Sequence, residues 1–201
     1  MVQLPAMGTS APIPARPSAR QELLDRTMVY VAHHGMSSVS LRELATAVGT
    51  SHRMLIYHFG NREGLVAAIV AAMEAQQRVV LEQLADAATN PRDVITAQWR
   101  RLADPALRPF VVLFFEVLAL ALQRRPGADG FLEQLTAPWL DLASELARRW
   151  ELPTTREEML LGIAVVRGLI LEAVASGDYE ASAAALHRFL EMWDGDRSRR
   201  G

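Results

Sequence analysis

A dense run of helix signals over residues 40–65, SLRELATAVGTSHRMLIYHFGNREGL, constrains the fold more than any other part of the chain. Ser40 and Glu43 have the spacing of a capping box at the start of a short helix. Gly49 suits the left-handed residue of a tight turn, and Ser51 can cap the short helix that follows. Two short helices joined by a glycine turn predict a helix-turn-helix.

The second of these helices, over residues 52–59, has two chemically different faces. With ~100° per residue, Leu55 and Phe59 share an apolar face that packs inward. Arg53 and Tyr57 lie on the opposite face, so this short helix has the size and chemistry to enter the major groove of DNA. Arg53 suits a bidentate contact to guanine. His52 lies on the first turn. Tyr57 and His58 could reach phosphate oxygens, and Ile56 or Met54 could touch a thymine methyl.

A third helix signal follows directly. Asn61 can cap a helix that begins Arg62-Glu63-Gly64-Leu65. The free backbone N–H groups of its first turn, together with Arg62, would form a clamp for a phosphate beside the groove.

These residues resemble the N-terminal DNA-binding domain of the tetracycline-repressor (TetR) family of bacterial transcription regulators, over roughly residues 20–69. The matching pieces are Gly35, SLRELA, the turn Gly49-Thr50-Ser51, LIYHF and Asn61-Arg62-Glu63-Gly64-Leu65. The resemblance implies that the second and third helices form the helix-turn-helix and that the fourth links it to a ligand domain. It also implies DNA contacts, which fall on Ser40, Arg42, Ser51, His52, Arg53, Tyr57, His58 and Arg62, with Ser40, His58 and Arg62 on the DNA backbone.

Three positions depart from the family pattern. Ile56 stands where family members usually carry a tyrosine that touches phosphate, so that contact is missing and Tyr57 is its candidate substitute. Thr50 replaces an aliphatic turn residue. Arg62 replaces a lysine, and the phosphate clamp survives this change because arginine also binds phosphate.

The chain as a whole predicts an all-α protein of about nine helices, with four segments. We expect a disordered arm over residues 1–17, the helix-turn-helix domain over 18–65, a ligand-binding and dimerisation domain over 66–194 and a disordered tail over 195–201. A minor-groove arm that uses Arg16 and Arg20 is the alternative for the N-terminal segment.

Charge and composition add weaker constraints. The net charge is −2, but residues 1–65 carry six Arg against four acids, whereas residues 66–201 carry fifteen against nineteen, which favours DNA at the N-terminal part. The chain has no Cys, which fits a cytoplasmic protein without thiolate metal sites. We expect no metal and no cofactor. No apolar run reaches the ~20 uncharged residues of a membrane span, so no membrane partner is expected.

The segment from Met159 to Leu171 is apolar almost all round, interrupted only by Gly162, Arg167 and Gly168. A helix that is apolar on every side must be covered on every side. We therefore expect a homodimer through about residues 156–194, with paired recognition helices that read a palindromic operator. Burial of this helix within its own domain is the alternative.

The middle helices are expected to enclose a pocket for a small-molecule effector. Candidate lining residues are Met73, Trp99, Phe110, Phe114 and Trp139, with two polar exceptions, Glu116 and Arg167. A charge within an apolar run is costly unless it is paired. Glu116 and Arg167 are therefore read as polar anchors for an otherwise apolar effector, or as members of ion pairs. The aromatic residues are alternatively ordinary core.

The function that follows is a ligand-responsive regulator, most simply a repressor that an apolar effector releases from DNA. Two alternatives are a helical interaction protein that lost DNA binding and an all-α enzyme. The chain lacks the Glu-x-x-His pairs of carboxylate di-iron bundles, a Gly-x-Ser-x-Gly motif and a phosphate-binding loop. We therefore expect that it is not an enzyme.

Overall fold

The computed structural model describes residues 18–36, 39–126 and 130–200, and within these ranges every regular element is a helix. The all-α class is thus confirmed. The arm expected over residues 1–17, including the alternative role of Arg16, lies outside the described residues.

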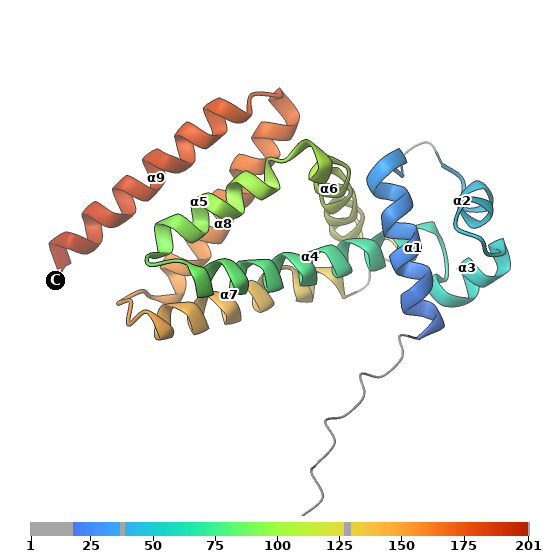
Figure 1. Ribbon diagram of the computed structural model, residues 1–201, viewed down its shortest axis with the longest axis horizontal. Coiled ribbons are helices and arrows are strands. Elements are labelled where there is room, and N and C mark those ends of the chain that lie inside the picture. Colours follow the sequence, from blue (N-terminus) through green and yellow to red (C-terminus); the bar gives the residue numbers. More distant parts are fainter. Residues whose placement is uncertain (1–17, 37–38, 127–129, 201) are drawn as a thin grey trace, which may run out of the picture.

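Three short helices gather at one end of the molecule, and a long one leads away from them (Figure 1). They are α1 (Ala19–His34), α2 (Leu41–Ala47), α3 (His52–Phe59) and α4 (Arg62–Ala87). The predicted caps at Ser40, Ser51 and Asn61 are confirmed, and Ser18 caps α1 in the same way. Each side chain accepts a hydrogen bond from a backbone N–H of the following first turn. Local capping chemistry therefore sets where these helices begin.

The remaining helices build a larger helical body along α4 (Figure 1). They are α5 (Pro91–Leu102), the 3₁₀ turn η1 (Pro105–Leu107), α6 (Arg108–Leu122), α7 (Phe131–Arg149), α8 (Arg156–Ser176) and α9 (Tyr179–Arg200). Helix α4 packs on α5, α6 and α7, and α8 packs on α6, α7 and α9.

Helix α9 corrects the expected C-terminal tail. The sequence predicted that the last helix ends at about residue 194 and that residues 195–201 form a tail, whereas α9 continues to Arg200. Gly195 lies inside this helix. A single glycine inside a helix costs only about 1 kcal/mol relative to alanine, which does not by itself end the helix.

The largest apolar core joins the two ends of the molecule. It contains Leu44, Leu55 and Phe59 from α2 and α3, and it continues without a break through α4 into Leu113 and Val117 of α6. A second core lies around Trp99 between α5, α6, α8 and α9, and a third joins α4, α5 and α7. The short N-terminal helices are therefore packed against the helical body rather than tethered to it.

Three stretches, α4, Pro105–Leu122 and α8, are long and apolar enough to cross a membrane by length and composition alone. Each has a charged side chain that bonds to another helix: Glu74 to α7, Glu116 to α4 and Arg167 to α7. In this fold the three stretches pack into one helical body.

Candidate functional site

Helix α3 presents one face to the core and the other to solvent. Leu55 and Phe59 are buried, whereas Arg53 is exposed and Tyr57 is 77% exposed. Met54 and Ile56 are 40% and 38% exposed, which leaves apolar groups beside the arginine. Within the described part of the chain Arg53 forms no ion pair. An outward row of Arg, Tyr and apolar side chains is suited to base edges and methyl groups in a DNA groove.

The turn before α3 is held by backbone geometry. Gly49 has a φ of +69°, the left-handed conformation that L side chains adopt with strain. The Thr50 N–H then donates to the Ala45 carbonyl at 2.9 Å, which closes the turn. Ser51 accepts from the Met54 N–H at 3.2 Å and starts α3. These bonds set the angle at which α3 leaves α2.

The capping box of α2 forms as predicted. Ser40 Oγ accepts from the Glu43 N–H at 3.3 Å, and the Ser40 N–H donates to Glu43 Oε2 at 2.9 Å. The backbone hydrogen bond from Ser40 is the main reason that the pKa of Glu43 lies below its ordinary value. Ser40 and Arg42, both exposed, lie at the same helix start.

Arg20 holds the far end of α3. Its guanidinium lies over the Phe59 ring, 4.9 Å from the centroid, and its Nε donates to the His58 carbonyl at 3.4 Å. A cation that bonds one of the last carbonyls of a helix also suits the negative end of the helix dipole. Arg20 therefore supports α3, a role that the sequence interpretation of an N-terminal arm missed.

Arg62 points to the helical body. Its Nη1 forms an ion pair with Glu116 Oε1 at 2.9 Å, and its Nη2 donates to the Met36 carbonyl at 3.0 Å. Both side chains of the pair are about one-third exposed, at 31% and 32%. The start of α4 is thereby joined to α6 and to the end of α1, and the phosphate clamp expected at Arg62 is not preformed.

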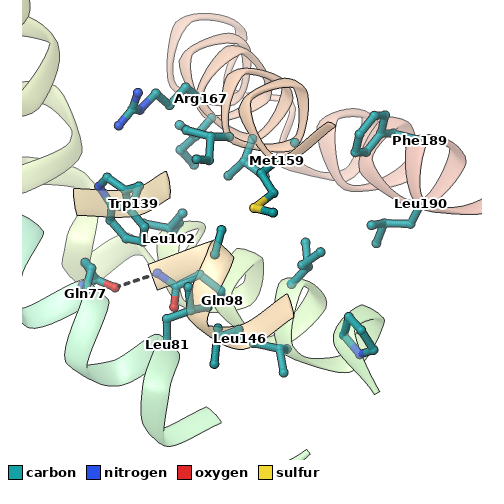
Figure 2. A pocket seen from close by; sticks show the side chains of 18 of the residues that line it. Gln77, Leu81, Gln98, Leu102, Trp139, Leu146, Met159, Arg167, Phe189 and Leu190 are labelled. Atoms are coloured by element: carbon teal, nitrogen blue, oxygen red, sulfur yellow. Dashed lines mark hydrogen bonds between the residues drawn. The ribbon is translucent and has the colours of Figure 1, made fainter. Parts of the chain in front are cut away.

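A cavity of about 300 Å³ lies within the helical body, bounded by residues of η1 and of α4 to α9. Figure 2 shows side chains that line it, with Arg167 at one side and Phe189 and Leu190 at the other. The volume is at the lower end of the range for small-molecule sites, and the lining is mostly apolar, as in such sites generally.

Two charged groups lie at the Trp139 side of the cavity. Trp139 Nε1 donates to Glu74 Oε2 at 2.5 Å. Burial raises the pKa of Glu74, although the indole hydrogen bond and the charges of Arg167 and Arg78 oppose this. Burial likewise lowers the pKa of Arg167, which donates to Thr136 Oγ1 at 3.0 Å and to the Leu135 carbonyl.

Two glutamines that bond to each other add neutral polar groups to the cavity lining. Gln98 Nε2 of α5 donates to Gln77 Oε1 of α4 at 3.1 Å, and each residue is only 6% exposed. The Gln98 Oε1 atom is buried and has no hydrogen-bond partner in the described part of the chain.

Comparison with known proteins decides the family of the N-terminal part. Residues 23–69 match the family model described as bacterial regulatory proteins, tetR family. This chain carries the TetR-family N-terminal domain. The match covers α3 and the start of α4, and it agrees with the resemblance found from the sequence.

Solved structures extend the TetR likeness over most of the chain. A transcriptional regulator from Rhodococcus sp. is 18% identical with a TM-score of 0.67, and 87% of this chain aligns with 95% of that one. A TetR-family transcriptional regulator from Pectobacterium atrosepticum is 19% identical with a TM-score of 0.61, over 87% and 91%. At these identities the likeness is one of fold. A search of curated proteins finds no significant match.

A third similar structure contains a ligand. Thermus thermophilus FadR, a TetR-family transcriptional repressor in complex with lauroyl-CoA, is 17% identical to this chain. The TM-score is 0.59, and 86% of this chain aligns with 92% of that chain.

The predicted effector residues divide into three groups on this TetR fold. Five of them line the cavity: Met73, Phe110, Phe114, Trp139 and Arg167. Trp99 does not, because it packs in the core with Ala173 and Leu186, which do not line the cavity either. Glu116 does not either, because it pairs with Arg62. The expectations for Trp99 and Glu116 as cavity residues are corrected accordingly.

The cavity also has three polar lining residues that the sequence did not predict, Glu74, Gln77 and Gln98. One signal was available, because Gln77 recurs at helical spacing with the buried Val70 and thus falls on an apolar face. A polar side chain on such a face needs a partner, and that partner lies on another helix.

Proposed function

We propose that this protein is a ligand-responsive transcriptional regulator that acts in the cytoplasm, most simply as a repressor and not as an enzyme. It binds a palindromic operator as a homodimer and is released by a small, largely apolar effector. The observation that carries the proposal is the outward face of α3, where Arg53 and Tyr57 stand exposed on a helix that is capped at its start and held by Arg20 at its end.

The DNA contacts follow from the position of each side chain. Arg53 reads a guanine, and His52 and Tyr57 extend the contact along the groove. Ser40 and His58 contact the phosphate backbone. Arg42 and Ser51 contact the DNA from the starts of α2 and α3, where free N–H groups attract anions. Arg62 contacts the phosphate backbone as well once its ion pair with Glu116 is broken.

The dimer uses α8 and α9, over about residues 156–194. Only Ile170 and Ala173 of α8 are buried in the protomer. The exposed apolar residues recur at helical spacing and form one stripe, made of Leu160, Leu161, Ala164, Gly168, Leu171 and Ala175. Covering this stripe with the same stripe of a second copy gives a two-fold interface.

Two glycines of α8 act differently in this scheme. A Cβ at Gly162 would lie 2.9 Å from the Trp193 ring of α9, so Gly162 makes room inside the protomer. A Cβ at Gly168 would meet no atom within 4 Å, so Gly168 is open for a partner helix.

The cavity is the effector site, and the lauroyl-CoA bound by a TetR-family repressor of similar fold supports this assignment. The effector signal passes along α4 and α6. The apolar core and the Arg62–Glu116 pair join both helices to the end of the molecule that carries α2 and α3, the DNA-reading end. We accordingly propose residues 18–65 as the DNA-binding part and 66–194 as the effector and dimer part. An effector works only if it binds one conformation better than the other.

Selection of bound sequences from a random duplex pool, with the full-length protein, tests the proposal. The expected result is a palindrome whose half-site centres are about 34–36 Å apart or a multiple of that distance. An enriched sequence without two-fold symmetry would contradict binding as a symmetric dimer. A pool without enrichment would contradict sequence-specific DNA binding altogether.

A further inference from the structure

One of the residues that line the cavity carries an unpaired acceptor. Two buried side-chain polar atoms have no partner in the described part of the chain, Gln98 Oε1 and Arg92 Nε, and both residues line the cavity. The Arg92 guanidinium is otherwise engaged, because Nη2 donates to the His187 carbonyl and Nη1 lies 3.7 Å from Asp194. The amide oxygen of Gln98 is therefore the sharper feature, since buried acceptors are almost always paired.

The glutamine pair sets how Gln98 meets the cavity. Its Nε2 donates to Gln77 Oε1 at 3.1 Å, which holds the amide between α4 and α5. In Figure 2 the amide nitrogen is turned to Gln77 and the oxygen is turned away from it. Gln98 as a whole is only 6% exposed. The acceptor is thus fixed before any ligand arrives.

The surroundings of Gln98 are apolar. Leu81, Leu102 and Leu146 line the same part of the cavity (Figure 2). A hydrogen bond formed there is stronger than one in water. A carboxylate at the same point would place its own acceptor oxygens against the amide oxygen, and two acceptors cannot form a hydrogen bond. The two charged groups at the Trp139 side of the cavity already have neutral hydrogen-bond partners, since Arg167 bonds Thr136 and Glu74 accepts from Trp139.

We propose that the effector is an uncharged, mostly apolar molecule that donates one hydrogen bond, from a hydroxyl or an amide N–H, to Gln98 Oε1. This inference rests on the proposed function, in that it takes the cavity as the effector site, and it deepens that proposal by assigning the chemistry of the effector. Gln98 is the residue that distinguishes an alcohol from a ketone or an acid of the same length.

Calorimetric titration of the full-length protein with n-octanol, methyl hexyl ketone and octanoate tests the inference. The three probes have eight-carbon skeletons and differ in the group that meets Gln98. We expect n-octanol to bind about tenfold tighter than either of the others, as one gained hydrogen bond provides. Equal or tighter binding of the ketone or of octanoate, or no binding of n-octanol, would overturn the inference.

Two variants locate the preference. Gln98→Leu removes the acceptor at similar volume. In this variant we expect n-octanol and the ketone to bind with about equal affinity. Met159→Leu, a volume-conserving change in the same cavity, should keep the preference. A preference that survives Gln98→Leu would overturn the assignment. The wild-type comparison does not depend on how the variants fold.

Operator affinity, measured separately with saturating n-octanol, keeps this inference distinct from the proposed function. If the alcohol preference is present and operator affinity does not change, the ligand chemistry is supported and the switch fails. If operator binding is specific and n-octanol does not bind, the DNA-binding proposal stands and the inference on the effector is wrong.

Discussion

At the scale of single residues, exposure separates the side chains of α3 that can read DNA from those that hold the helix. Tyr57 is 77% exposed and Arg53 is exposed, whereas Leu55 is 1% exposed. Water-exposed Arg and Tyr have little effect on folding, so their replacement is expected to change recognition far more than stability.

Replacement of Arg53 tests direct readout. Arg53→Ala is expected to weaken operator binding by about 1–3 kcal/mol and to relax the preference at one base step, because a bidentate guanine contact is lost. Competition binding against single-base variants of the selected operator measures both effects. Arg101→Ala, at an exposed arginine of α5, is the matched control and should change neither. Equal weakening for all sequences would show that Arg53 contacts phosphate instead.

Glu74 gives a prediction on pH. Burial raises the pKa of Glu74 in the folded protein, so the folded state holds its proton to higher pH than the unfolded state. The contribution to stability is therefore full below the unfolded pKa of about 4.3 and is lost as the pH rises through the folded pKa. Glu74→Gln should remove this decline and retain an acceptor for Trp139.

Urea unfolding at several pH values between about 4 and 8 measures the difference between Glu74→Gln and wild type. Glu82→Gln, at an exposed position of the same helix, is the control. A wild-type and a Glu74→Gln curve that run parallel over this range would show that Glu74 is not the group responsible.

At the scale of elements, α4 connects the DNA-reading end to the cavity. It starts at Arg62, which pairs with α6, and its later turns contribute Met73 and Gln77 to the cavity wall. One helix of 26 residues therefore carries both the ion pair and the cavity contacts. A shift of α4 relative to α6 would alter both together.

A double-mutant cycle of Arg62→Ala and Glu116→Ala tests the strength of that link. We expect an interaction energy of about 0.5–1.5 kcal/mol, because both side chains of the pair are only about one-third exposed and water screens them only in part. Urea unfolding of the four proteins measures it. Strict additivity of the two single changes would mean that the pair contributes nothing to the fold.

The same residues give a separate prediction for DNA. If Arg62 leaves Glu116 to meet a phosphate, Arg62→Ala weakens all sequences alike and lowers the salt slope of binding by about one unit. Glu116→Ala leaves that slope unchanged, because the guanidinium is still present. A salt slope that is the same in Arg62→Ala and wild type would exclude the phosphate contact.

At the scale of the whole molecule, the protomer leaves apolar surface uncovered along α8 and α9. Leu160, Leu161 and Leu171 are 46%, 53% and 47% exposed, and Met192 of α9 is 60% exposed. A contiguous apolar stripe of this kind marks an interaction site on a soluble domain. In the dimer that we propose, symmetric pairing of two protomers would cover this stripe and bring two α3 helices to one duplex.

A charge placed in that stripe should separate the protomers. Leu161→Glu is expected to convert the dimer to a monomer and to weaken operator binding, because a buried unpaired carboxylate in the interface is costly. Sedimentation equilibrium measures the mass, and circular dichroism checks that the helices remain. Val79→Glu, at a similarly exposed apolar residue of α4, should remain dimeric. A dimeric Leu161→Glu protein would place the interface elsewhere.

What the sequence by itself determined is the set of helices and the helix-turn-helix. Ser40, Ser51, Asn61 and Thr155 each cap a helix through an N–H three residues ahead. These signals are readable because capping is complete within one turn of chain. Gly49 is readable for the same reason, since its backbone conformation is a local property.

Only the tertiary structure decided which side chains face the cavity. Trp99 and Trp139 look alike in the sequence, yet the first is core and the second lines the cavity beside Glu74. Glu116 bonds to Arg62, which is 54 positions away in the sequence, and Gln98 bonds to Gln77, which is 21 positions away. Such partners depend on how helices that are distant in the chain cross, and helical periodicity gives the face of a residue but not what lies opposite it.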